Sequence, residues 1–194
     1  MPKLVLASAS PRRSELLKQL ELEFTVFPSG AEETLLEGNL PASEVERLAY
    51  EKARDVWQRI ERAEDFVILG ADTVVVLEER ILGKPENAEE AREMLLALSG
   101  KWHRVLTGIA LVDFEGNLIY QGHEETKVLF ADLTAEEIAK YLDSGEALDK
   151  AGAYGIQGRA AKFVKKINGC YFNVMGLPLA HLYGILKRKR VDVF

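Results

Sequence analysis

The chain has 194 residues, 47% of them hydrophobic, and its 25 lysines and arginines against 31 aspartates and glutamates give a net charge of −6. This length is typical of one domain, whose core can bury about 70% of the unfolded surface. The acidic balance argues against a protein whose whole surface binds nucleic acid. The apolar run at residues 66–77 is shorter than the ~20 residues of a membrane helix, and the N-terminus lacks the apolar stretch of a secretory signal. The single cysteine excludes an internal disulfide, so we expect a cytoplasmic protein.

Strand and helix patterns alternate in the first half of the chain. Ser10 and Pro11 are typical of a helix N-terminus, and Ser43 with Glu46 has the spacing of a capping box. After Ser43, apolar residues recur at helical spacing on one face. The expected elements are a strand over 3–7, a helix from Pro11 to about Leu20, a strand over 24–27, an acidic loop over 28–40, a helix from Ser43 to about Ile60 and a hairpin over 66–82.

The second half continues the alternation and contains a glycine-rich segment. The expected elements are a helix from Asn87 to Gly100, paired strands over 102–114 and 118–130, a helix from Thr134 to Gly145, a glycine-rich loop over 149–158, a hairpin over 163–174 that turns at Asn168-Gly169, and a helix opened by Pro178. Because no repeat or linker-like shift interrupts this order, we predict one α/β domain over residues 1–194 with a mixed sheet. Two lobes with a cleft between them would fit the same order.

Asp72 stands inside an otherwise apolar run, where an unpaired buried carboxylate would cost several kcal/mol. A turn after Gly70 could satisfy it by hydrogen bonding. Alternatively, Asp72 is an acid at a strand end in a cleft, where it binds a metal ion or activates water. We favour the functional interpretation, because a charge held in an apolar segment is a frequent mark of a functional site.

Lys52 interrupts an apolar helical stripe in a similar way. At about 100° per residue it falls between Leu48 and Val56. Its ammonium could reach solvent from the end of the stripe, since long stems cover apolar surface readily. If the helix lines a cleft, the ammonium would instead face an anion.

Two arginines, Arg12 and Arg13, lie in the first turn of a predicted helix beside Ser8 and Ser10. Helix N-termini favour anions, so cations there indicate a phosphate or carboxylate nearby. The alternative is that one arginine is solvated and the other is paired with a surface acid. Lys84 adds a further cation after the first predicted hairpin.

The loop over 149–158 has three glycines in seven residues, from Gly152 to Gly158, surrounded by side chains able to recognise a ligand. It has neither the Walker spacing nor the dinucleotide-binding pattern, and the alternative to a ligand-binding loop is a tight loop with a purely structural role.

The histidines are dispersed and Cys170 has no partner at a metal-ligand spacing, so zinc is not predicted. The basic segment Lys187–Arg190 is interpreted as surface charge at a helix end.

Taken together, these unusual segments resemble the Maf family, in order and over nearly the whole chain. The segments that carry the resemblance are Ser8–Arg13, Lys52-Ala53, Gly70–Thr73, Gly83–Pro85, Asp149–Gly158 and Asn173–Pro178. The resemblance implies a nucleoside triphosphate pyrophosphatase with a fold related to the inosine triphosphatases. It also implies a divalent cation, Mg²⁺ or Mn²⁺, and release of a nucleoside monophosphate and pyrophosphate.

The resemblance assigns catalytic roles by matching motif. It implies that Asp72 accepts the proton, that Glu33 is a catalytic or metal-linked acid, and that these two carboxylates are the metal ligands. It further implies that Arg13, Lys52 and Lys84 are cations that face the phosphates. Whether Asp72 removes the proton or chiefly holds the ion stays open.

Substrate-binding roles follow from the same resemblance. Ser8 belongs to the motif that contains the arginines, and Arg12, Thr73 and Gln157 match the family's specificity positions. The sequence of the loop over 149–158 is similar to the branch that acts on dTTP and UTP rather than the branch for 7-methyl-GTP.

The family also suggests a homodimer. From the acidic charge balance and the short apolar run we expect neither nucleic acid nor a membrane as a partner. CTP and modified pyrimidine nucleotides are further substrate candidates for such an enzyme. A non-catalytic regulator of septum formation, acting through a partner or nucleic acid, is the alternative from another functional class.

Overall fold

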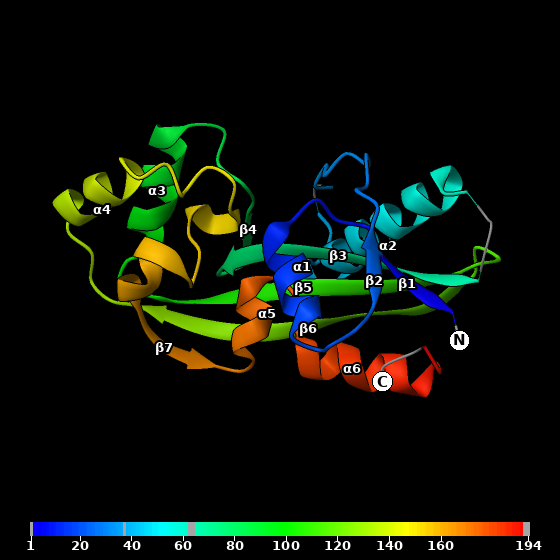
Figure 1. Cartoon of the computed structure of the whole chain (residues 1–194). Helices are drawn as coiled ribbons and strands as arrows, with labels where there is room; N and C mark the ends of the chain where they lie inside the picture. The colour runs from blue at the N-terminus through cyan, green and yellow to red at the C-terminus, as the bar shows by residue number, and fades with distance from the viewer. Residues whose placement is uncertain (1, 37, 62–64, 192–194) are drawn as a thin grey trace. The chain divides into compact units, whose positions relative to one another are not determined.

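The computed structural model describes residues 2–36, 38–61 and 65–191 (Figure 1). Its strands are β1 (Lys3–Leu6), β2 (Phe24–Val26), β3 (Phe66–Leu77), β4 (Arg80–Leu82), β5 (Trp102–Asp113), β6 (Leu118–Phe130) and β7 (Val164–Asn168). Its α-helices are α1 (Pro11–Lys18), α2 (Pro41–Arg59), α3 (Ala88–Leu98), α4 (Ala135–Leu142), α5 (Tyr171–Met175) and α6 (Leu179–Arg188), and two 3-10 turns are η1 (Ala151–Ala153) and η2 (Gly158–Phe163). No helix in the described ranges is long and apolar enough to cross a membrane.

The sheet is mixed, which confirms the predicted α/β class. Its strands follow the order β2-β1-β3-β5-β6-β7, and β4 pairs with β3. β1 runs parallel to both β2 and β3, whereas β3–β4 and β6–β7 are antiparallel. The parallel strands belong to the first part of the chain, where helices separate them, and the antiparallel pair β3–β4 is the predicted hairpin.

The chain divides into two compact units. The first comprises residues 1–72, 107–124 and 176–194, and the second comprises residues 73–106 and 125–175. The single domain over 1–194 and the cleft stay predictions.

In the first unit, α2 approaches the sheet more closely than side chains would allow. A Cβ on Gly70 of β3 would lie 2.0 Å from the carbonyl oxygen of Ala49, and a Cβ on Gly108 of β5 would lie 2.1 Å from that of Val45. The helix backbone therefore rests on the strands at two glycines. The predicted apolar stripe of α2 is the face that it buries.

The core of the second unit forms around α3, α4 and the 3-10 turns. Phe130, Tyr141 and Phe163 are almost completely buried there, and burial of each such ring contributes about 1.5–3 kcal/mol. The predicted caps of both helices are confirmed. Asn87 accepts hydrogen bonds from the amides of Glu89 and Glu90, and Thr134 forms a complete capping box with Glu137.

Two local predictions are wrong. The helix expected from Ser43 begins at Pro41 with Leu40 as its N-cap, so Ser43 and Glu46 lie within the helix and form no capping box. Proline at the first helical position favours this earlier start, because its fixed φ suits a helix and its missing N–H is not needed there.

The hairpin expected over 163–174 is also wrong, because β7 is followed by the short helix α5 rather than by a second strand. The Thr126 hydroxyl donates to the Cys170 carbonyl and accepts from the Cys170 amide, which fixes the chain just after the turn. The buried Asn173 amide donates to the Val105 carbonyl and to Thr126 Oγ1. These long-range bonds favour the helix over the alternating pattern of the local sequence.

Candidate functional site

Arg13 is a buried cation held at the start of α1. Its Nε donates to the carbonyl of Gly176 at 2.9 Å, and its Nη1 donates to Ser8 Oγ at 3.3 Å. Burial lowers the pKa of Arg13, and the negative charges of Asp72 and Glu33 act in the opposite direction. An arginine stays charged under such conditions, so this part of the first unit holds a fixed positive charge. The interpretation in which Arg13 is solvated or paired at the surface is wrong.

Lys52 connects two carboxylates within the first unit. Its Nζ lies 2.5 Å from Asp72 Oδ1 and 2.6 Å from Glu33 Oε1. Lys52 and Asp72 are only 7% and 6% exposed, whereas the Glu33 side chain is 41% exposed. The interpretation in which the Lys52 ammonium reaches solvent is therefore wrong. No turn follows Gly70 to hold Asp72 either, because β3 continues through both residues. The expected place of Asp72 at a strand end is wrong for the same reason, since β3 runs on to Leu77.

The close approach of α2 to β3 explains why these two side chains meet. Asp72 lies two residues after Gly70 and thus on the same face of the strand, while Lys52 lies one helical turn after Ala49. The contact of Gly70 with Ala49 consequently places the ammonium beside the carboxylate.

The cluster combines two carboxylates with two cations, so its formal charges balance. An ionised carboxylate here can accept a proton, and the cations can bind phosphate oxygens. Lys52 contacts one oxygen of each carboxylate, and each has a second oxygen of the kind that Mg²⁺ binds. Over residues 2–36, 38–61 and 65–191, no group of three or more His, Cys, Asp or Glu residues could hold a metal. Two carboxylates completed by phosphate oxygens and water fit Mg²⁺, which needs only one or two protein carboxylates.

The remaining predicted site residues belong partly to the first unit and partly to the second. Arg12 is half-buried next to Arg13 in the first unit, and Thr73 follows Asp72 on β3 as the first residue of the second unit. Lys84 and Gln157 are exposed residues of the second unit, and Gln157 directly precedes η2. The structure thus brings Ser8, Arg13, Glu33, Lys52 and Asp72 together within one unit.

The glycine-rich loop is bound to the segment that carries Lys84. The Gly152 amide donates to the Gly83 carbonyl at 3.0 Å. Gly152 has a φ of +66°, and a Cβ there would lie 2.9 Å from the Cβ of Val75. At this glycine the close approach is to a strand of the protein itself, so the structural interpretation accounts for Gly152. Gln157, in the same loop, is exposed, so its side chain is accessible from solvent.

Sequence reasoning missed three contributors around this cluster. The carbonyl of Gly176 holds Arg13, and a backbone acceptor leaves no residue-type signal. Glu44 and Arg47 of α2 bind the loop that carries Glu33. Their spacing of three residues resembles that of any surface ion pair on a helix, so only the burial of Glu44 distinguishes them.

Comparison with known proteins identifies the family of the chain. The family described as Maf-like protein matches residues 3–189. A dTTP/UTP pyrophosphatase of Ruminiclostridium cellulolyticum is 48% identical over 97% of this chain and 96% of its own. One from Pelotomaculum thermopropionicum is 50% identical over 97% of each chain. A crystal structure of a nucleoside-triphosphatase / dITP/XTP pyrophosphatase from Mycobacterium abscessus aligns with 69% of this chain and 76% of its own, at 19% identity and a TM-score of 0.43. With the match to residues 3–189 and the near-complete coverage of relatives about half identical to it, the chain belongs to the Maf family.

Proposed function

We propose that this chain is a nucleoside triphosphate pyrophosphatase that converts dTTP and UTP to their monophosphates and pyrophosphate. The observation that carries the proposal is the Lys52 ammonium between Asp72 and Glu33. The names of relatives about half identical over nearly the whole length support the substrate class. No observation on the described residues favours the non-catalytic regulator of septum formation.

In the proposed reaction, water attacks the α-phosphorus. The new bond joins the water oxygen to this phosphorus, the bond from the α-phosphorus to the bridging oxygen breaks, and pyrophosphate leaves with that oxygen. Asp72 accepts the proton of the attacking water. Arg13, Lys52 and Lys84 bind phosphate oxygens and offset the charge that develops on the leaving group.

The proposal includes a divalent cation, Mg²⁺ or Mn²⁺, held by Asp72 and Glu33 together with oxygens of the substrate. When bound, the ion would neutralise phosphate charge and polarise the phosphoryl group that is attacked. The protein supplies the two carboxylates next to one another, because Lys52 contacts both of them. Ser8 fixes Arg13 beside them by accepting a hydrogen bond from its guanidinium.

Removal of divalent cations is expected to abolish pyrophosphate release from dTTP without unfolding the protein. The charges of Arg13, Lys52, Asp72 and Glu33 balance without an ion, so the melting temperature should change by less than about 2 °C, equivalent to under about 1 kcal/mol. Excess EDTA, followed by Mg²⁺ or Mn²⁺ in excess of the chelator, tests this when the dTMP formed together with pyrophosphate is measured directly by chromatography, with no coupling enzyme that EDTA could inhibit. Full turnover in EDTA would remove the cation from the proposal.

Base recognition is proposed for Gln157, with Arg12 and Thr73. The amide of Gln157 offers one acceptor and one donor, which suits the N3–H and a carbonyl of uracil or thymine. Cytosine reverses part of that pattern, and a mismatch of this kind costs about 1–3 kcal/mol. We therefore expect dTTP and UTP to be better substrates than CTP, and all three to be better than ATP and GTP.

The Gln157→Ala variant is expected to flatten the pyrimidine ranking more than it lowers the best kcat/KM. Gln157 is exposed, so the substitution should leave the melting temperature unchanged. A panel of triphosphates, including modified pyrimidine nucleotides, measures both effects. A preference of the unaltered protein for purine triphosphates would contradict the assignment of Gln157 and of the dTTP/UTP branch.

A single domain over residues 1–194, a homodimer and a cytoplasmic location complete the proposal. The assembly can be measured by sedimentation or light scattering. Failure to release pyrophosphate from any triphosphate in the panel, with Mg²⁺ present, would favour the regulator instead.

A further inference from the structure

Helix α2 holds the loop that carries Glu33 at two places, one on each side of Lys52. Toward the helix C-terminus, Asp55 Oδ2 accepts from Ser29 Oγ at 3.0 Å and from the Gly30 amide at 2.8 Å. Arg59 Nη2 also donates to the Pro28 carbonyl at 2.8 Å. These contacts fix the start of the loop, before Glu33.

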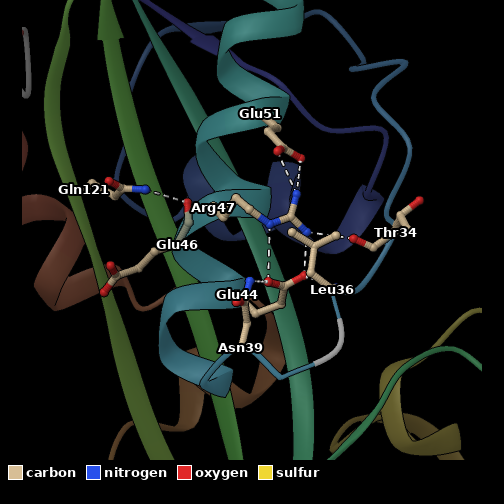
Figure 2. A network of polar contacts seen from close by, with 8 residues as sticks. All are labelled: Thr34, Leu36, Asn39, Glu44, Glu46, Arg47, Glu51 and Gln121. Carbon is tan, nitrogen blue, oxygen red and sulfur yellow. Dashed lines mark hydrogen bonds and ion pairs between the residues drawn. The ribbon is translucent and has the colours of Figure 1, made fainter.

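The second attachment lies at the N-terminal end of α2 and is built on a buried carboxylate (Figure 2). Glu44 Oε1 accepts from the Leu36 amide at 2.8 Å, and Glu44 Oε2 accepts from Asn39 Nδ2 at 2.8 Å. Arg47 pairs with Glu44 and donates from Nη2 to the Thr34 carbonyl at 2.7 Å. Glu44 and Arg47 thus hold backbone groups directly after Glu33.

The buried charge of Glu44 is fully matched by donors. Its side chain has no exposed surface, and an unpaired carboxylate in such a place would cost several kcal/mol. Burial raises the pKa of Glu44, but hydrogen bonds from Arg47, Asn39 and the Leu36 amide outweigh it and lower the pKa to about 2. Glu44 is therefore ionised at neutral pH, and two of the donors that match its charge, the Leu36 amide and Asn39 Nδ2, come from the loop.

Glu33 depends on this attachment because it is not fixed by burial itself. Its side chain is 41% exposed, and it reaches Lys52 from an irregular segment. The next residue, Thr34, is the one whose carbonyl Arg47 binds. We propose that Glu44 and Arg47 are positioning residues that hold residues 34–36, so that the Glu33 carboxylate meets Lys52 at the site of the proposed reaction. This inference rests on the proposed function.

Stabilisation of α2 is a simpler role for Glu44 and must be separated from positioning of Glu33, because Glu44 also lies in the first turn of this helix. A negative charge there stabilises a helix through its dipole. Such a role would alter stability without acting through Glu33.

Glu51→Gln is the matched control for Glu44→Gln. Glu51 is on the same helix and binds Arg47 Nη1 at 2.6 and 2.7 Å, whereas Glu44 itself accepts from the Leu36 amide of the loop. Hydrogen–deuterium exchange in the full chain without substrate should be at least about tenfold faster over residues 31–36 in Glu44→Gln. The same segment should be unchanged in Glu51→Gln. Equal exchange in the two variants would overturn the inference.

Turnover provides the second readout, measured with dTTP and Mg²⁺ under single-turnover conditions so that slow rates can be followed. We expect Glu44→Gln to lower the rate of cleavage by about ten- to a hundredfold, since misplacing a catalytic group by 1 Å can cost about 10²-fold. Glu51→Gln should retain the rate of the unaltered chain. In a Glu33→Gln background, adding Glu44→Gln should produce no further loss, because its effect passes through Glu33.

Each outcome bears on one of the two proposals. An equal loss in both backgrounds, or faster exchange with an unchanged rate, would overturn the positioning role. If Glu44→Gln does not fold, Arg47→Lys takes its place, since a lysine keeps the charge but lacks the planar group that binds Glu44 and the Thr34 carbonyl together. Inactivity of the unaltered chain toward all pyrimidine triphosphates would refute the proposed function, whereas the exchange comparison would still decide whether Glu44 holds the loop.

Discussion

Replacing Asp72 with asparagine is expected to lower kcat for dTTP by about two orders of magnitude or more, as loss of a general base or metal ligand does. The fold should persist, because asparagine has nearly the same size and Lys52 keeps its contact with Glu33. Nucleotide binding, measured by calorimetry, should be largely retained. Pyrophosphate release measured across substrate concentrations separates the loss in kcat from any change in KM.

Asp143→Asn is the control for this experiment, because Asp143 is exposed at the C-terminal end of α4 in the second unit. Its kcat and melting temperature should match those of the unaltered protein. Turnover within about threefold of normal in Asp72→Asn would remove Asp72 from the mechanism and leave Glu33 as the candidate proton acceptor.

Lys52→Met is expected to abolish activity and to destabilise the fold. The substitution leaves the buried Asp72 carboxylate without its ammonium, and removal of one partner of a buried ion pair costs about 3–5 kcal/mol. Urea unfolding measures this loss. Adding Asp72→Asn to Lys52→Met should restore part of the stability, since the unpaired charge is then gone, but should not restore turnover.

The single variant Lys52→Met separates catalysis from folding when its turnover and its folded fraction are measured together. A Lys52→Met protein that is inactive while more than half folded at the assay temperature places Lys52 in the reaction. If Lys52→Met keeps normal turnover, the ammonium is structural and the proposed role for it is wrong.

The two central residues could be predicted because each breaks a local pattern. Asp72 is a charge within an apolar run, and Lys52 is a charge within an apolar helical stripe. Burying either charge in a core without a partner would cost several kcal/mol of free energy. Their pairing could not be predicted from the sequence, since it depends on the backbone contact between α2 and β3 rather than on spacing along the chain.

The wrong helix start at Ser43 had a local cause, because Pro41 favours an earlier first turn. The wrong hairpin and the missed role of Glu44 arose where distant contacts determine the local structure. Alternating residues and an Asn-Gly turn predicted a second strand after β7, but Thr126 and Val105 bind the segment as the helix α5. Glu44 resembled an ordinary surface residue of a helix, because its partners lie in an irregular loop whose path no periodicity reveals. Local patterns thus predicted most elements, the loop over 28–40 and the unusual charges of Arg13, Lys52 and Asp72, but not the path of the loop that brings Glu33 to Lys52.

The contacts of Gly70 and Gly108 with α2 restrict how the protein could be engineered for greater stability. Exchanging glycine for alanine often stabilises a protein by about 0.4–1 kcal/mol, because the unfolded chain becomes stiffer. At these two positions the added methyl group would meet a backbone carbonyl at 2.0 or 2.1 Å and force the helix away from the sheet. The same displacement would carry Lys52 away from Asp72, so both thermal robustness and the charge arrangement of the site would be lost together.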